Sequence, residues 1–403
     1  MTEPTNTSIN LPEPVLVTRL SELRQLVDRL MAEPLVAVDT ESNSLYVYQE
    51  RVCLVQFSIP QGSGSSQEVT DYLVDPLALP DLSLLAPVFA DPKIEKIFHA
   101  AEYDLVCLRR DYDFDFANLF DTMLAARILG RDGLGLAALL ESVFGVQIDK
   151  RYQRADWGQR PLPPHMLSYA RLDTHYLIEL RHRMRAMLEK AGRLALAEED
   201  FHRLCLNARP GSNGSPEPCL NISGVFDLTP QQVAVLLSLC AYRDQMARRF
   251  DRPLFKVFGD KTLMAIATTC PTSLDGLRGL PGMSVGQVKR HGIALLQAVQ
   301  RGLRAEPVRL HRPPRPNDAY LTRLDALRQW RKVAARGLAV ESDVVLPRDL
   351  MYALAEQNPR RYEELEQVLK YTPWRFEHFG SEIARVLHIR FETVPGEKQQ
   401  GGA

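Results

Sequence analysis

Five residues in the first half of the chain have types and spacings that suit chemistry at phosphodiesters. They are Asp39 and Glu41 in LVAVDTES, Asp104 in IFHAAEYDL, and Tyr169 with Asp173 in LSYARLDTHYL. Carboxylate oxygens suit Mg²⁺ or Mn²⁺ rather than zinc, which prefers nitrogen and sulfur ligands. Two such ions can hold both the attacking and the leaving oxygen of a displacement at phosphorus. The residue types therefore predict a metal-dependent chemistry.

The sequence around the first pair would place its two carboxylates side by side. The apolar run 35–38 is short and contains β-branched residues, which is typical of a buried strand. Residues two apart on a strand point to the same face, so Asp39 and Glu41 would share one side of a sheet. Like charges this close repel each other unless a cation neutralises them.

The other three residues fall on helical patterns. Tyr169 and Asp173 lie in 164–187, which reads as a helix, where a spacing of four stacks side chains on one face. Asp104 comes early in a second helical stretch, 100–110. A phenol with an unperturbed pKa of about 10 is a poor base at neutral pH, but its hydroxyl could orient an attacking water.

These segments resemble the Exo I, Exo II and Exo III motifs of the DEDD 3'-to-5' exonucleases, and specifically of ribonuclease D. The family pattern is D-x-E, a later D, and Y-x-x-x-D, and all five positions match. The resemblance implies four metal ligands, of which the first bridges two ions, and a tyrosine that positions the water: Asp39, Glu41, Asp104, Asp173 and Tyr169. A sister branch has histidine five residues before the last aspartate. Ser168 stands there, so the chain resembles the tyrosine branch.

Neighbouring residues leave alternatives open. The stretch 153–162 also resembles ribonuclease D in its Gln-x-x-Asp-Trp-x-x-Arg-Pro-Leu pattern. Trp157 within it could stack a nucleobase or serve as a packing anchor. His99, near Asp104, is either a hydrogen-bonded structural histidine or a substrate contact, and we leave it outside the catalytic set. Each short motif alone is common at solvated turns and helix faces, so their order along the chain carries the functional interpretation.

Composition agrees with this interpretation without requiring it. The 403 residues are enough for two or three domains. A formal net charge of −1 excludes a uniformly basic protein, so nucleic-acid affinity must come from local patches such as 309–315. The six cysteines show no C-x-x-C spacing and are expected to be reduced, mostly buried thiols. The N-terminal residues 1–14 lack a secretory signal and no apolar run could span a bilayer, which predicts a soluble, cytoplasmic protein.

The second half of the chain is helical in pattern and contains a weak internal repeat. The pattern L-x5-YR at 236–243 is echoed by L-x5-WR at 324–331. The first copy resembles the HRDC domain of ribonuclease D and RecQ-type helicases, up to its LPG ending at 280–282. That resemblance implies an accessory role in nucleic-acid binding, and the alternative is a pair of packing modules that brace the catalytic domain. The second copy departs more, with YTPW at 371–374 in place of the Pro-Gly ending.

The order of patterns predicts an α/β domain with a mixed sheet followed by all-α units. Strand candidates lie at 35–39, 52–59, 71–74 and 94–98, ahead of helical patterns at 122–129 and 136–144. The family resemblance implies a ribonuclease-H-like topology for this domain. The segments we expect are a 3'-5' exonuclease domain at 15–206, a linker at 207–226, an HRDC domain at 227–304, a linker at 305–317 and a second HRDC-like helical domain at 318–392.

We expect a 3'-to-5' exoribonuclease that hydrolyses RNA 3' ends with two divalent ions, Mg²⁺ or Mn²⁺, and releases 5'-mononucleotides. Structured RNA such as transfer-RNA precursors is the substrate that the resemblance implies, and no membrane partner is expected. Two alternatives stay open: a DNA 3'-5' exonuclease with the same motifs, and a non-catalytic RNA-binding protein with a decayed nuclease fold. The intact carboxylates argue against decay, because a binder has no reason to keep repelling acids together. Oligomeric state is left open, and a monomer fits three units in one chain.

Overall fold

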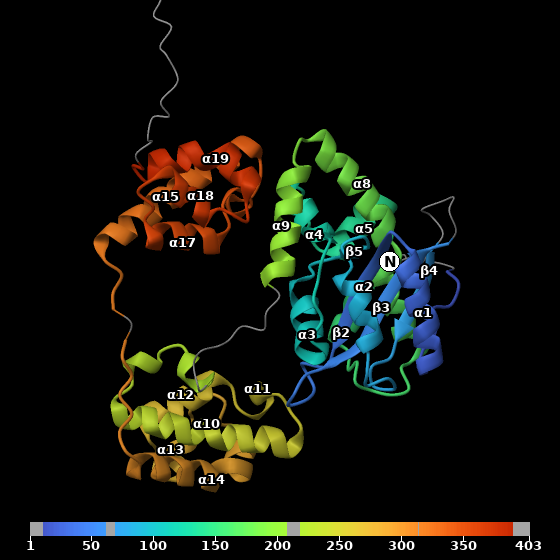
Figure 1. Cartoon of the computed structure of the whole chain (residues 1–403). Coiled ribbons are helices and arrows are strands. Elements are labelled where there is room, and N and C mark those ends of the chain that lie inside the picture. Colours follow the sequence, from blue (N-terminus) through green and yellow to red (C-terminus); the bar gives the residue numbers. More distant parts are fainter. Residues whose placement is uncertain (1–10, 62–68, 208–217, 313, 390–403) are drawn as a thin grey trace, which may run out of the picture.

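The computed structural model describes residues 11–61, 69–207, 218–312 and 314–389, which form three bodies (Figure 1). A body built on a sheet comes first, and two helical bundles follow it. Each body has its own core of buried apolar side chains. The predicted fold class, α/β followed by all-α, is confirmed.

Parts of the predicted termini and linkers lie outside the described residues. These are residues 1–10, half of the first linker (208–217), residue 313 of the second linker, and residues 390–392 of the last predicted domain. Within the described ranges, no helix is long and apolar enough to cross a membrane.

Six strands form one mixed sheet in the order β1-β4-β3-β2-β5-β6. They are β1 (Val15–Val17), β2 (Leu35–Ser42), β3 (Val52–Pro60), β4 (Val69–Val74), β5 (Glu95–Phe98) and β6 (Leu119–Asp121). β2 pairs antiparallel with β3 and parallel with β5, so the strand that carries the first two candidate ligands lies inside the sheet. Strands covered on both faces need continuous apolar, β-branched runs, and β2 and β3 have them.

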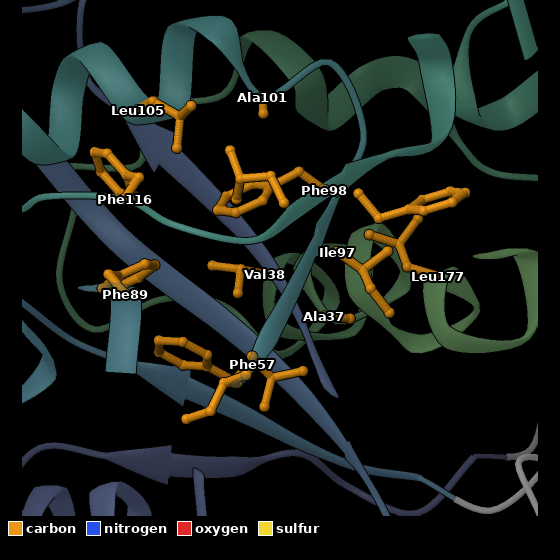
Figure 2. Packing of buried hydrophobic residues seen from close by; sticks show 14 of the residues in the cluster. Ala37, Val38, Phe57, Phe89, Ile97, Phe98, Ala101, Leu105, Phe116 and Leu177 are labelled. Carbon is orange, nitrogen blue, oxygen red and sulfur yellow. The ribbon is translucent and has the colours of Figure 1, made fainter. Parts of the chain in front are cut away.

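Helices α1 to α9 belong to the same body. They are α1 (Leu20–Ala32), α2 (Ala86–Ala90), α3 (Glu102–Tyr112), α4 (Thr122–Ile128), α5 (Leu136–Phe144), α6 (Pro164–Ala170), α7 (Leu172–His175), α8 (Leu177–Lys190) and α9 (Leu194–Asn207). Figure 2 shows the core around the central strands, where Val38 and Phe57 lie near Phe89 of α2. On the side of Leu177, α8 packs against β2 and β5. This packing fixes the buried start of β2, from which the candidate ligands continue.

The two bundles repeat one plan. The first contains α10 (Pro230–Phe250), α11 (Leu254–Val257), α12 (Asp260–Thr269), α13 (Leu274–Leu277) and α14 (Val285–Arg304). The second contains α15 (Asp318–Leu338), α16 (Ser342–Val345), α17 (Arg348–Gln357), α18 (Tyr362–Val368) and α19 (Pro373–Val386). In both copies the first three helices have 21, 4 and 10 residues. The internal repeat predicted from the sequence is therefore a structural repeat.

Short 3-10 turns lie between these elements at Ser83–Leu85, Lys150–Arg154, Pro218–Asn221 and Val225–Asp227.

The first bundle contacts the sheet body through the loop that follows β2. The Tyr48 hydroxyl hydrogen-bonds with Asp244, and Arg248 Nε donates to the same hydroxyl over 2.9 Å. Lys256 Nζ lies 4.4 Å from the ring centre of Tyr46. The loop that leaves the candidate ligand strand is thus also the loop that meets the first bundle (Figure 1).

A buried ion pair fixes the second bundle against α9. The Arg375 guanidinium is fully buried and pairs with Glu199 at 2.7 Å and with Asp200 at 2.8 Å. Arg203 on α9 adds a 2.7 Å pair with Asp349 of the bundle. Separating the bundle from α9 would leave buried charges without their partners, which costs free energy, so this contact stabilises the position of the bundle.

The expectation of six reduced thiols is wrong for two cysteines. Cys219 and Cys240 form a disulfide that joins the 3-10 turn at Pro218–Asn221 to α10, with Cα atoms 6.4 Å apart. The two cysteines are 21 residues apart in the chain, so local spacing could not reveal the pairing. The free cysteines are Cys53, Cys107, Cys205 and the half-buried Cys270, and the first three are buried as expected.

Candidate active site

Three of the four predicted ligands converge on one point. Asp39 and Glu41 extend from the same face of β2, and Asp173 reaches them from α7. One carboxylate oxygen from each lies within 4.8 Å of the others. The donor set is made of oxygen alone and carries up to three negative charges, which fits a hard divalent cation.

The fourth predicted ligand lies beside this group. Asp104 is buried on α3, in the first turn of the helix, and one of its carboxylate oxygens accepts a hydrogen bond from the Thr40 hydroxyl. Its negative charge acts on Asp39, Glu41 and Asp173. The structure thus brings all four carboxylates into one neighbourhood, with Asp104 outside the three that converge most closely.

Burial raises the pKa of every carboxyl group in this neighbourhood, and repulsion by neighbouring acids of the site raises it further for Asp39, Glu41 and Asp173. Burial is the largest cause for Asp39, followed by the charges of Asp104, Asp173 and Glu41, and its pKa is raised well above the usual value. Burial and then Asp104 raise the pKa of Asp173 to about 8, and burial raises that of Asp104 to about 7. Buried like charges need either protons or cations to coexist, so the site favours binding of positive charge.

Tyr169 stands next to these acids as a protonated phenol. The residue is buried on α6, and burial raises the pKa of its hydroxyl far above the usual range, with further contributions from Asp173, Glu41 and Asp39. The hydroxyl therefore keeps its proton at neutral pH and can donate a hydrogen bond. The prediction of one continuous helix over 164–187 is wrong, since the segment is divided into α6, α7 and α8 with breaks at Arg171 and Tyr176. Tyr169 and Asp173 nevertheless lie at the same site.

Two open alternatives can now be decided. Trp157 is only 1% exposed and packs in a cluster with Cys53, Met166 and Tyr169, so it is a packing anchor rather than a free stacking surface. His99 Nδ1 lies 2.9 Å from the Thr122 hydroxyl, and burial lowers its pKa to about 4. It is a neutral, hydrogen-bonded structural histidine, which justifies its place outside the catalytic set.

Sequence reasoning missed Asp121, which organises the start of α3. Its carboxylate caps α4 by accepting from the backbone N–H groups of Met123 and Leu124. The same carboxylate accepts from the N–H groups of Ala100 and Ala101, directly before α3. It therefore fixes the turn that presents Asp104. An aspartate just before a helical pattern is a typical N-cap signal, but only the fold reveals the second contact.

Gln56 is a second residue that sequence reasoning missed. It is fully buried on β3, directly opposite Asp39 in the β2–β3 register, and its Nε2 lies 3.5 Å from an Asp39 carboxylate oxygen. Its Oε1 has no hydrogen-bond partner within the described residues. A buried polar side chain at this place would orient the central carboxylate.

Comparison with known proteins gives matches over most of the chain. A 3'-5' exonuclease family model matches residues 14–189, and the HRDC domain model matches twice, at 232–299 and 321–387. Ribonuclease D of Gluconacetobacter diazotrophicus is 32% identical over 327 residues, covering 78% of this chain and 80% of that protein. Protein RRP6-like 3 of Arabidopsis thaliana is 34% identical over 290 residues, or 65% of this chain. The chain spans 31% of that plant protein and 46% of Protein RRP6-like 1.

Solved structures show the same architecture. Escherichia coli RNase D, described as an exoribonuclease involved in structured RNA processing, matches with a TM-score of 0.68 over 94% of this chain and 99% of that one. Its sequence identity is 23%, so this likeness shows the fold. The catalytic core of RRP6 from Trypanosoma brucei matches with a TM-score of 0.61 and 30% identity over 74% of this chain and 81% of that one.

Proposed function

The chain belongs to the ribonuclease D family of 3'-5' exonucleases, and on this premise we propose that it shortens RNA from the 3' end, one nucleotide at a time, and releases 5'-mononucleotides. The observation that carries the proposal is the convergence of Asp39, Glu41 and Asp173, with their oxygens within 4.8 Å. Exonuclease chemistry needs such a cluster, and a binding protein has no use for it.

Four carboxylates would hold two divalent ions, Mg²⁺ or Mn²⁺: Asp39, which would bridge the ions, with Glu41, Asp104 and Asp173. When bound, such ions supply a nucleophile at neutral pH and stabilise the charge that develops on the leaving oxygen. The oxygen-only donor set and the raised pKa values of these groups support this assignment. The chain's own contribution is to hold the acids together and to keep the site partly closed to solvent.

Tyr169 would orient the attacking water. Because burial keeps its hydroxyl protonated, the phenol can donate a hydrogen bond to the water oxygen and direct a lone pair at phosphorus. The tyrosine does not accept the proton in this scheme. Its position beside Asp173, on the helix before it, supports this role.

A basic cavity on the first bundle would hold the RNA strand that leads to the site. The cavity measures about 520 Å³, and four of its lining residues are cations: Arg249, Arg252, Lys256 and Arg290. No acidic residue lines it, and none of the four cations forms an ion pair within the part of the chain that the structure describes.

The place of this cavity suits an RNA backbone that runs toward the metal centre. Lys256 lies over Tyr46 in the loop after β2, so the cavity borders the contact between the first bundle and the loop that leaves the strand of Asp39 and Glu41. Phosphate neutralisation by arginine and lysine supplies most of the affinity of sequence-independent binding. Structured RNA with a free 3' extension, such as a transfer-RNA precursor, is the substrate class we propose. The cytoplasmic location stays a prediction.

A time course on two matched substrates tests the proposal. A 3'-extended transfer RNA and DNA of the same sequence, each labelled at the 5' end, are incubated with Mg²⁺ or with chelator. We expect a metal-dependent ladder on RNA that shortens by single nucleotides. A ladder on DNA alone would make the protein a DNA exonuclease, and tight binding without cleavage of either would make it an RNA-binding protein.

A further inference from the structure

The two residues that follow Asp173 in α7, Thr174 and His175, make buried hydrogen-bonded contacts. The hydroxyl oxygens of Thr174 and Ser58 lie 2.7 Å apart, and the Ser58 hydroxyl is also 2.7 Å from an Asp71 carboxylate oxygen. His175 Nδ1 lies 2.8 Å from the other Asp71 oxygen. Ser58 and Thr174 are fully buried, and the His175 side chain is 10% exposed. The two residues after Asp173 are therefore tied to neighbouring strands.

These contacts lie on the sheet face that carries the candidate metal ligands. Ser58 on β3 is the cross-strand partner of Asp71 on β4, and Gln56, two residues before Ser58, is the partner of Asp39 on β2. Cross-strand partners and residues two apart share one face of a sheet. Helix α7 packs across β2, β3 and β4, so Asp173 reaches the ligands of β2 while its neighbours are held by β3 and β4.

One directed chain of hydrogen bonds satisfies the whole network. A carboxylate only accepts, so Asp71 can take one bond from the Ser58 hydroxyl and another from His175 Nδ1–H. The Ser58 oxygen is then free to accept from the Thr174 hydroxyl. Each donor and acceptor has a partner, which makes the network rigid rather than adaptable.

Helix α7 needs external support because it is only four residues long. A single helical turn is unstable on its own, so side chains must fix its place on the sheet. When cations replace the protons of these acids, the Asp173 carboxylate faces like charges on Asp39 and Glu41, which push it away from the site. The network opposes that displacement.

We propose that Ser58, Asp71, Thr174 and His175 are positioning residues that hold the Asp173 carboxylate in the metal centre before the cations arrive. The inference rests on the proposed function, since it concerns the same centre. Residues that orient a metal ligand through hydrogen bonds commonly change metal affinity by roughly 10–100-fold when they are replaced.

The test is Mn²⁺ binding to the full chain by titration calorimetry in the absence of RNA, together with turnover at increasing Mn²⁺. Thr174→Val removes the hydroxyl at nearly constant volume, and we expect the Kd for Mn²⁺ to rise by roughly 10–100-fold. At saturating Mn²⁺, kcat should return close to the wild-type value. Thr174→Ser keeps the hydroxyl and should keep the wild-type Kd.

Thr372→Val in the second bundle is the matched control. Thr372 is also fully buried, and its hydroxyl donates to the backbone carbonyl of Leu369, three residues earlier, far from the metal centre in the chain's second bundle. This control should leave the Kd for Mn²⁺ unchanged. If Thr174→Val does not fold, Ser58→Ala carries the same test, because it interrupts the same chain of hydrogen bonds.

The outcomes separate this inference from the proposed function. A wild-type chain that neither binds Mn²⁺ nor cleaves RNA overturns the proposed function, and the positioning role with it. A wild-type chain that does both, while Thr174→Val and Ser58→Ala keep its Kd within twofold, overturns the positioning role alone. Equal weakening by Thr372→Val would also overturn it, since a general loss of packing would then explain the effect.

Discussion

Asp173→Asn should abolish a loss of folding stability that the metal-free protein undergoes as the pH rises. In the folded chain, burial and Asp104 raise the pKa of Asp173 from 3.8 to about 8. The folded protein therefore binds a proton at Asp173 that the unfolded chain has already lost at pH 6. Stability falls with rising pH wherever the folded state holds more protons, so metal-free wild type loses stability between pH 6 and pH 8.

The expected magnitude follows from proton linkage. One extra proton in the folded state changes stability by about 1.4 kcal/mol for each pH unit. Because the proton is half lost at pH 8, the Asp173 contribution over this interval is about 2 kcal/mol, or about 4–8 °C in Tm for a domain of this size. Asparagine resembles the protonated acid, so wild type and Asp173→Asn should melt together at pH 6 and separate at pH 8, with the variant more stable.

Thermal melts in chelator at both pH values measure this difference. Asp132→Asn, which replaces an exposed acid in a loop, is the control and should follow wild type at both pH values. Adding Mn²⁺ at pH 8 should stabilise wild type and close the gap, since the cation compensates the charges that the variant lacks. A gap of equal size at pH 6 and pH 8, or a metal-free wild type that gains stability as pH rises, would refute the reasoning.

Three further predictions concern the water, the second bundle and the RNA. Tyr169→Phe should lower kcat by about a hundredfold through a misplaced nucleophile, and it should leave the Kd for Mn²⁺ unchanged; an unchanged kcat would reduce Tyr169 to packing. Arg375→Ala leaves Glu199 buried without its partner, which should cost about 3–5 kcal/mol. Calorimetry of this variant should therefore show the second bundle melting separately. A variant that melts in one transition, as the wild type does, would contradict this. Arg249→Ala combined with Arg290→Ala should raise KM for long RNA and weaken its salt dependence while sparing dinucleotides, and an equal effect on dinucleotides would count against the basic cavity.

The sequence predicted the central elements because they carry strong local signals. The apolar, β-branched runs at 35–39 and 52–59 correspond to β2 and β3, and the helical pattern at 136–144 matches α5. The sequence gives no clear signal for β1 and β6, at three residues each, because so short a strand is defined by its pairing.

The site could be predicted only in part. Asp39 and Glu41 were expected to share a face from their spacing, and the convergence of Asp173 on them agrees with what the family resemblance implied. The contacts of Asp121 with α3 and of Ser58 with Thr174 join segments that are distant in the chain, and no local pattern encodes them. Ordinary serine, threonine and aspartate residues acquire such roles only through the fold.

The most direct test of the central claim joins metal stoichiometry to turnover at Asp39. Mn²⁺ is titrated into the wild-type chain and into Asp39→Ala, and both are then given the 5'-labelled, 3'-extended RNA. We predict that wild type binds two ions and produces a single-nucleotide ladder. The variant should keep its fold by circular dichroism, lose the bridging ligand with at least one ion, and leave the RNA intact. Wild-type rates in Asp39→Ala would contradict the account, because the shared ligand would then be dispensable.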